Sequence, residues 1–298
     1  MDILRQLDAG RGEYYRHGNS GALLQAAGEW LEQAGLQVMR GPANFNVQEE
    51  AGVLCDGFEH QPMVGMGYTP SYYRDLLEAV GLRKAKDLLV YREEAYMAQM
   101  DRMAALALRR DGVAVRPVDV ANLGKESQFF STVWEQAWRD NWGMVPISAK
   151  EFEEAYQRYG FFIVPELALL VEVDGKPAGC ALVMPDMNEL LKRMNGRVLP
   201  TGWWHLLTGR SGIDRYRCFF GGVVPEYRRL GLPVILLSRL QKEFLRRGAQ
   251  TLEFSWVLET NEEIIGIASR IGAKRVQTLR LYERDLAAEE RRDASRPG

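Results

Sequence analysis

The residues that point most directly to chemistry lie in the segment 219–240, which reads FFGGVVPEYRRLGLPVILLSRL. An apolar run ends at Val224, a turn follows at Pro225, and a helical pattern begins near Leu232. The first N–H groups of a helix have no partner within it, and the helix dipole favours an anion beside them. Gly231 has no side chain, so the backbone there can approach a phosphate closely. These residues predict a pyrophosphate-binding turn over 229–232.

The elements that must position this turn fill the second half of the chain. Apolar periodicity and turn signals predict alternating strands and helices. The expected strands are 113–118, 168–173, 177–184, 216–224, 251–257 and 274 onward, and the expected helices are 128–141, 231–248 and 261–272. Asp174 and Gly175 predict a tight hairpin turn. This order predicts a mixed α/β fold.

The first part of the chain repeats part of that order. Segments 18–35 and 231–248 both begin and end with Gly and carry apolar residues at helical spacing. In both copies a strand, a helix and a basic, apolar strand follow, and the first copy carries a Gly- and Pro-rich insertion over 46–71 that we expect to be a loop. The first copy therefore looks like half a domain, and its open edge offers a surface for homo-oligomers.

Composition narrows the class of protein. The 298 residues are 46% hydrophobic and 26% charged, with a net charge of -2, which is typical of globular proteins and gives no reason to expect a nucleic-acid partner. The three cysteines are widely spaced, so we expect no metal site and no disulfide framework. We expect no signal peptide and no transmembrane segment. A cytoplasmic location, with peripheral membrane contact as an alternative, is therefore expected.

The turn resembles the acyl-CoA-binding motif of GNAT proteins (GCN5-related N-acetyltransferases), Q/R-x-x-G-x-G/A. Arg228 and Gly231 fill the first two defined positions, whereas Pro233 stands where Gly or Ala is usual. The resemblance covers residues 113–283 and, in degenerate form, the first copy. It implies a GNAT fold in the second half, preceded by a partial repeat. The expected boundaries are 1–92 for the partial repeat, 93–112 for a linker helix, 113–286 for the complete domain and 287–298 for a disordered tail.

The same resemblance implies acetyl-CoA or a longer acyl-CoA as a substrate and direct attack of an amine on the thioester. A backbone N–H on the bulged strand before the turn would stabilise the oxyanion, and Gly221 and Gly222 would allow a bulge there. The expected residues in contact with the acyl-CoA are Val223, Val224, Arg228, Arg229, Leu230, Gly231, Leu232 and Asn261.

Proton carriers are the next requirement of that reaction. The helix position where many GNAT proteins carry an acidic Tyr is Ala268 here. Tyr282 on the last strand is the alternative acid, although a tyrosine there is more often a core residue. Glu259 follows a strand and is the expected base, with a solvated or helix-end carboxylate as the alternative. His205 is a rival base because its ordinary pKa suits the task.

The acceptor is left open between a small-molecule amine and a lipid-like amine. Trp203 and Trp204 lie in a loop-like stretch and could line an apolar pocket. The two-copy pattern also resembles a bacterial branch of the family that includes ceramide-forming, long-chain N-acyltransferases. The remaining alternative is a catalytically silent module that binds CoA or a partner.

Overall fold

The computed structural model describes residues 18–44, 46–93, 104–105, 112–194, 204 and 209–286. The chain divides into two compact units. The first unit comprises Met1–Leu89, Val257–Glu262 and Arg275–Gly298, and the second unit comprises Val90–Trp256 and Glu263–Lys274. Most of the expected linker helix over 93–112 and all of the expected tail over 287–298 lie outside the described residues.

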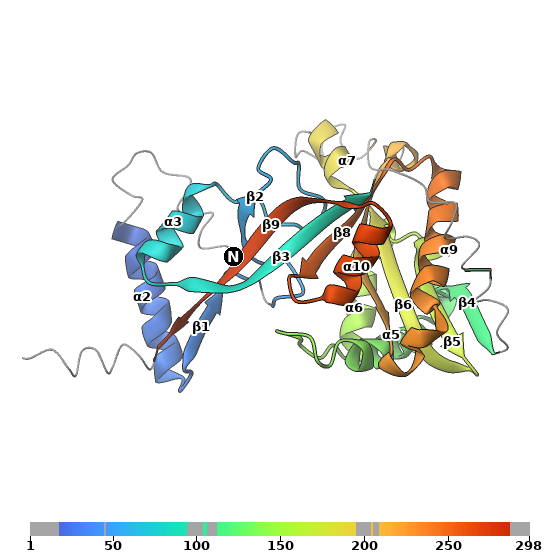
Figure 1. Cartoon of the computed structure of the whole chain (residues 1–298), viewed down its shortest axis with the longest axis horizontal. Coiled ribbons are helices and arrows are strands. Elements are labelled where there is room, and N and C mark those ends of the chain that lie inside the picture. Colours follow the sequence, from blue (N-terminus) through green and yellow to red (C-terminus); the bar gives the residue numbers. More distant parts are fainter. Residues whose placement is uncertain are drawn as a thin grey trace, which may run out of the picture. The chain divides into compact units, whose positions relative to one another are not determined.

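The second unit is built on a sheet with strand order β4-β5-β6-β7-β8. Its strands are β4 (Val113–Pro117), β5 (Ala168–Val173), β6 (Lys176–Pro185), β7 (Arg215–Val223) and β8 (Thr251–Leu258) (Figure 1). Neighbouring strands are antiparallel from β4 to β7, and β8 runs parallel to β7. A parallel pair needs a crossover connection, and α9 (Leu232–Arg247) supplies it between β7 and β8.

The hairpin of β5 and β6 forms at the turn that the sequence predicted. Val173 pairs with Lys176, and the two residues between them, Asp174 and Gly175, have φ values of 50° and 72°. Two successive residues with positive φ are typical of the turn whose twist matches that of paired strands.

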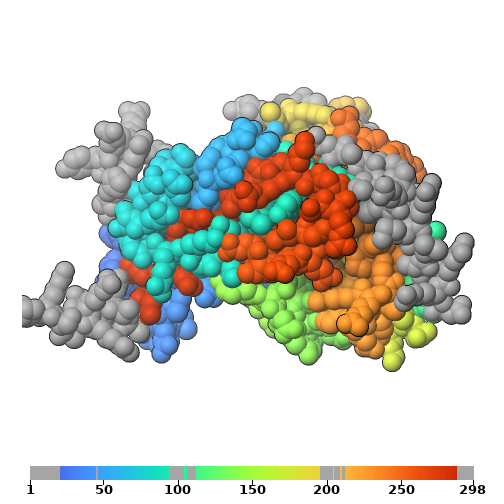
Figure 2. Space-filling view, viewed as in Figure 1, coloured from blue at the N-terminus to red at the C-terminus, as the bar shows by residue number. Residues whose placement is uncertain are grey.

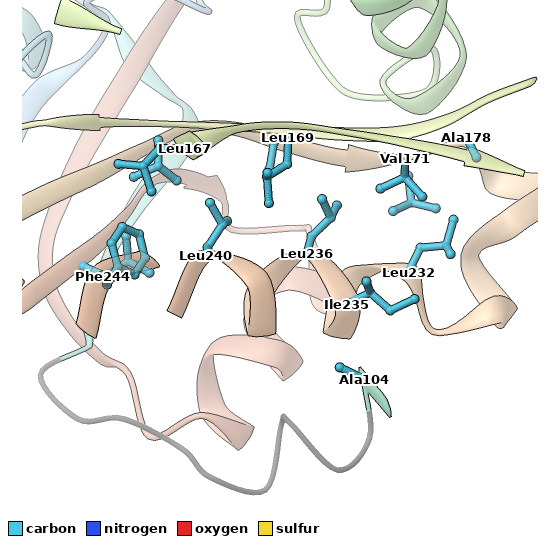
Figure 3. Close-up of a cluster of buried hydrophobic side chains, with 14 of the residues drawn as sticks. Ala104, Leu167, Leu169, Val171, Ala178, Leu232, Ile235, Leu236, Leu240 and Phe244 are labelled. Carbon is cyan, nitrogen blue, oxygen red and sulfur yellow. The ribbon is translucent and has the colours of Figure 1, made fainter. Parts of the chain in front are cut away.

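The main core of the second unit lies between α9 and one face of this sheet (Figure 3). The helix contributes apolar residues at intervals of one, three and four, the periodicity of a single helical face. These are Leu232, Ile235, Leu236, Leu240 and Phe244. Leu169 and Val171 of β5 point to this face, whereas Leu170 between them points to the opposite face, as a strand requires.

The opposite face is covered by α5 (Leu123–Ala137), whose Phe129, Val133 and Ala137 pack against Leu170 and Cys180. Later in the chain follow two more helices, α6 (Ala149–Tyr159) and the short α7 (Asn188–Arg193). α6 begins at a capping box in which Ser148 and Glu151 bond each other's backbone N–H groups. The helix α10 (Glu262–Arg270) buries only Ala268, and its outer surface is visible in the space-filling view (Figure 2).

The first unit pairs its strands around β9 (Lys274–Asp285), whose neighbours in the sheet are β1 (Val38–Gly41) and β3 (Arg83–Glu93). β2 (Val53–Asp56) also pairs with β9. Helices α2 (Gly18–Gln33) and α3 (Tyr72–Ala79) pack apolar residues against Tyr282, Met39 and Val53. The insertion over 46–71 is therefore not only a loop, because β2 lies within it and finds its partner far along the chain.

Candidate functional site

Strands β7 and β8 separate part of the way along their length, and this fork is the main feature of the second unit. Their parallel pairing begins at Arg215↔Thr251 and stops at Cys218↔Phe254, although β7 continues to Val223 and β8 to Leu258. β6 and β8 are the neighbours of β7 in the sheet. Beyond Cys218, the edge of β7 that faces β8 therefore has no paired strand among the described residues, and we call it the open edge.

The N–H groups on that open edge follow from the pairing with β6. Val224 donates its N–H to the carbonyl oxygen of Ala178, and successive N–H groups of a strand point to opposite edges. The N–H groups of Gly221 and Val223 consequently face the fork. Gly221 is exposed in the middle of its strand, which marks the opening. Val224, predicted to contact the acyl-CoA, directs its own N–H into the sheet.

A bulge in β7 lies at Phe219. Leu182 pairs with Phe220 and Val183 with Cys218, so Phe219 has no partner on β6. The bulge was expected at Gly221 and Gly222, and that position is wrong because both glycines keep regular partners, Ala181 and Cys180. Gly222 instead makes room for Trp138, since a Cβ there would overlap the indole ring.

The predicted turn follows directly on this strand. A 3₁₀ helix spans Pro225–Leu230, and Gly231 takes a left-handed conformation with φ of 79° before α9 begins at Leu232. Pro233 has no N–H, but it lies in the first turn of the helix, where proline is well tolerated. Arg229 is exposed, whereas Leu230 packs against the α9 core.

The side chain of Arg228 holds this turn in place. Its Nε donates to the carbonyl oxygen of Val223 at 3.3 Å, and its Nη2 donates to the carbonyl oxygen of Ala137 at 3.2 Å. Arg228 also lies 3.7 Å from a carboxylate oxygen of Glu263. The arginine thus joins the end of β7 to the end of α5, and its contact with the acyl-CoA stays a prediction.

Aromatic rings gather beside the fork on the α5 face of the sheet. Phe220 of β7 lies edge-on to Phe130 and Trp134 at 5.7 and 6.1 Å between ring centroids. Trp134 stacks on Trp138 at 4.6 Å, and Phe152 of α6 completes the group. Trp134 is buried, but the other four rings keep partial exposure. This aromatic cluster (Phe130, Trp134, Trp138, Phe152, Phe220) makes an apolar wall next to the open edge of β7.

A buried polar group lies at the last paired rungs below the fork. Arg217 of β7 donates from Nε to the Ser255 hydroxyl at 2.8 Å, and Ser255 donates to Glu253 Oε1 at 2.9 Å. Arg92 donates to Glu253 Oε2 at 3.0 Å. Burial lowers the pKa of Arg217 to about 10, so it remains a cation at neutral pH. This group was not expected from the sequence, in which charged residues inside otherwise apolar strands are the available signal.

Glu259, the expected base, follows directly on β8 and belongs to the first unit. Its Oε2 accepts a hydrogen bond from Lys84 at 2.6 Å, and its Oε1 accepts one from the Asp87 N–H at 3.1 Å. Lys84 also bonds Asp87, which Arg280 contacts in turn at 2.7 Å. Both carboxylate oxygens of Glu259 thus already hold donors, an arrangement that suits an anchor between segments of the first unit.

The other expected proton carrier that the structure describes also belongs to the first unit. Tyr282 is fully buried in the core of that unit and donates its hydroxyl to Glu78 Oε1 at 2.9 Å. Burial raises the pKa of its hydroxyl well above the ordinary value. Asn261, in the same unit, directly precedes α10. His205 lies outside the described residues.

The part of the chain that the structure describes lacks two further features. There, no three His, Cys, Asp or Glu side chains lie together in a way that could hold a metal ion. Among the same residues, no helix combines the length and the apolar character needed to span a bilayer.

No protein-family model matches the sequence. The chain is 30% identical to Protein YghO of Escherichia coli (strain K12) over 279 residues, covering 89% of this chain and 70% of that protein. It is 31% identical to the bacterial ceramide synthase of Caulobacter vibrioides (strain NA1000 / CB15N) over 273 residues, covering 89% and 71%.

A solved structure shows the fold. The GCN5-related N-acetyltransferase from Sphaerobacter thermophilus superposes with a TM-score of 0.52 over 90% of this chain and 68% of that chain, at 16% identity. The expected mixed α/β fold of the GNAT type is thereby confirmed. The forked pair of β7 and β8 is the part of that fold on which the candidate site is built.

Proposed function

Because this chain belongs to the GNAT acyltransferase family, in the branch of YghO and the bacterial ceramide synthase, we propose that it transfers an acyl group from a CoA thioester to the amine of a lipid-like acceptor. Membership of the family supports N-acyl transfer in general terms. The use of acyl-CoA and the nature of the acceptor are the parts that we propose.

The observation that carries the proposal is the open edge of β7, which leads into the Gly231 turn. Gly221 and Val223 direct N–H groups towards the fork, where the amide groups of a pantetheine arm could pair with them as a strand would. The start of α9 follows and favours the pyrophosphate. One continuous backbone path thus supplies donors for an extended ligand with an anionic end.

The reaction that this path supports is direct aminolysis. The amine nitrogen forms a bond to the thioester carbonyl carbon, the carbon–sulfur bond breaks, and the products are an amide and a thiol. The nitrogen loses one proton and the departing thiolate gains one. A thiol nucleophile of the protein is not required, and burial raises the pKa of the Cys218 thiol to about 12, which keeps it neutral.

The lipid-like acceptor is supported by two observations. The chain is 31% identical to a protein named as a ceramide synthase, and the aromatic cluster forms a partly exposed apolar wall beside the fork. Rings that keep some exposure can cover a hydrocarbon chain and exclude water from it. Each CH₂ group buried in this way stabilises the complex by roughly 0.8 kcal/mol. An amine with a long hydrocarbon chain fits such a wall better than a small, charged amine.

Incubation with defined substrates tests the proposal. The purified chain is mixed with acetyl-CoA or palmitoyl-CoA and with a long-chain amino alcohol or a free amino acid. Amide products are measured by mass spectrometry and released CoA by a thiol-reactive dye. We expect amide formation from the long-chain amine with one CoA released per amide. Release of CoA without an amide, or no release with any pair of substrates, would contradict the proposed function.

A catalytically silent CoA-binding module is the second candidate, and Ala268 favours it. The position where many GNAT proteins carry an acidic tyrosine holds a buried alanine here. Tyr282, the alternative acid, already donates its hydroxyl to Glu78. The melting temperature of such a module would rise when it binds palmitoyl-CoA. It would yield no amide in the assay above.

A further inference from the structure

We propose that Arg217 is a positioning residue of the acyl-transfer site, held by Ser255 and Glu253 so that it fixes the Phe219 bulge at the fork between β7 and β8. This inference rests on the proposed function. It assigns a role to a buried group that neither the acyl-CoA turn nor the expected proton carriers use.

The Arg217 side chain is held by Ser255 at two points. Its Nε donates to the Ser255 hydroxyl at 2.8 Å, and its Nη2 donates to the Ser255 carbonyl oxygen at 3.3 Å. Ser255 in turn donates to Glu253, a carboxylate with no solvent exposure that also pairs with Arg92. Two hydrogen bonds to one residue fix the plane of the guanidinium group.

Arg217 contacts the bulge through the ring of Phe219. The guanidinium carbon of Arg217 lies 4.3 Å from the ring centroid of Phe219, well within the reach of a cation–π contact. Phe219 is the one residue of β7 between Tyr216 and Val223 without a partner on β6. The register gives Phe219 no opposite residue on β6, so the contact of its ring with Arg217 is a restraint on the orientation of the bulge.

The bulge lies next to the N–H group that would contact the thioester carbonyl. Gly221 lies two residues beyond Phe219, and its N–H is the first regular donor on the open edge. A thioester carbonyl oxygen becomes more negative as the amine attacks, so a fixed N–H beside it lowers the barrier. Displacing such a donor by about 1 Å can reduce the rate about 10²-fold. The orientation of the bulge therefore matters more to the rate than to substrate affinity.

A purely stabilising role explains this group poorly. Removing an ion from water usually offsets much of the attraction of its partner, and apolar replacements of similar volume are often as stable. The lowered pKa of Arg217 reflects that unfavourable burial. A buried cation one residue before the last paired rung is thus explained by what it positions.

Substitutions at both ends of the contact test the proposal. Phe219→Leu keeps apolar bulk but loses the ring, Arg217→Lys keeps the charge but loses the planar fork, and Phe219→Tyr keeps the ring. We expect the first two to lower kcat about 10²-fold with an unchanged KM for palmitoyl-CoA, and Phe219→Tyr to retain turnover. The matched control is Tyr159→Leu, which removes a second cation–π contact, that of Arg158 at 5.9 Å, on exposed α6, and should leave kcat unchanged.

A measurement that needs no turnover separates this inference from the proposed function. An isotope-labelled thioester carbonyl is followed by infrared difference spectroscopy in the bound acyl-CoA. We expect its stretching frequency to fall on binding to the wild-type chain, and to fall less in Phe219→Leu and Arg217→Lys at equal acyl-CoA affinity. A wild-type chain that polarises the carbonyl but forms no amide contradicts the proposed function while leaving the positioning role intact.

Three outcomes would overturn the inference. The first is normal kcat and normal carbonyl frequency in both variants. The second is equal loss in Phe219→Tyr and Phe219→Leu, because the ring would then be irrelevant. The third is a loss of turnover that follows a loss of Tm in both variants, because a structural role would then suffice.

Discussion

Gly231 combines two requirements at one residue, a left-handed backbone with φ of 79° and close access to the start of α9. The same helix ends at a second left-handed glycine, Gly248, with φ of 69°. Among the residues that the structure describes, none has an atom within 4 Å of a Cβ built at Gly248, its chain neighbours and own helix backbone aside. The two glycines therefore share a left-handed backbone that would strain any other residue, and only Gly231 lies in the proposed phosphate-binding turn.

Comparing alanine at these two sites isolates the ligand contact. Gly231→Ala and Gly248→Ala should each destabilise the fold by about 1–2 kcal/mol, the usual penalty of a left-handed side chain. Only Gly231→Ala should also weaken binding of palmitoyl-CoA, by at least tenfold in calorimetry. Equal affinity in the two folded variants would remove Gly231 from the binding site.

Glu259 is bound on both carboxylate oxygens, by Lys84 and by the Asp87 N–H. A base must accept a proton, and each carboxylate oxygen of Glu259 already accepts a hydrogen bond, one of them from Lys84 at 2.6 Å. Catalysis by Glu259 stays a prediction, and Glu259→Gln tests it against the anchor role. The anchor role predicts a lower Tm with turnover within a few-fold of wild type. A fall in turnover of roughly 10²–10⁴-fold at unchanged Tm would instead identify Glu259 as the base.

At the scale of elements, the end of β3 and the middle of α9 share a buried polar pair. Gln241 donates to Glu93 Oε1 at 3.2 Å, and both side chains are almost fully buried. Burial raises the pKa of Glu93 from 4.5 to about 7. Between these two pH values the folded chain holds a proton that the unfolded chain has already lost.

That difference predicts a pH dependence of stability with a definite sign. The contribution of Glu93 to the free energy of unfolding should decrease as the pH rises from 4.5 to about 7, and should change no further above that pH. Each pKa unit corresponds to about 1.4 kcal/mol. Glu93→Gln should remove this slope and be more stable than wild type at pH 8, as measured by denaturant unfolding. A slope that persists in the variant would show that another group causes it.

At the scale of the whole molecule, the two ends of the chain share one unit. Val38 of β1 pairs with Asp285, and Val53 of β2 pairs with Arg280, both residues of β9. Tyr282 and Leu286 complete the core that α3 and β1 begin. The first part of the chain thus depends on a strand that comes last in the sequence.

Fragments show whether this dependence is strict. Residues 1–92 lack β9, so β1 and β2 would have unpaired edges, and we expect no cooperative melt in circular dichroism. Residues 113–285 retain the ladder from β4 to β8 and most of the α9 core, so we expect a cooperative melt. A cooperative transition from the monomeric 1–92 fragment would contradict this view.

Local signals were enough to determine the elements around the candidate site. The apolar positions of α9 repeat with helical period, and Gly231 and Gly248 mark its ends. Asp174 and Gly175 specify the hairpin turn by their tolerance of positive φ. These features depend on neighbours within a few residues, which is why the sequence alone predicted them and, through the resemblance of the turn, the fold.

Only the tertiary structure determined which strands pair and in which register. The bulge at Phe219 arises from register with β6, and the Arg217–Ser255–Glu253 group arises from register with β8. β2 forms as a strand because it pairs with β9, which lies more than two hundred residues later in the chain. Such pairings join residues far apart in the chain, and since a shift of register by one residue turns every side chain to the other face, no local pattern could specify them.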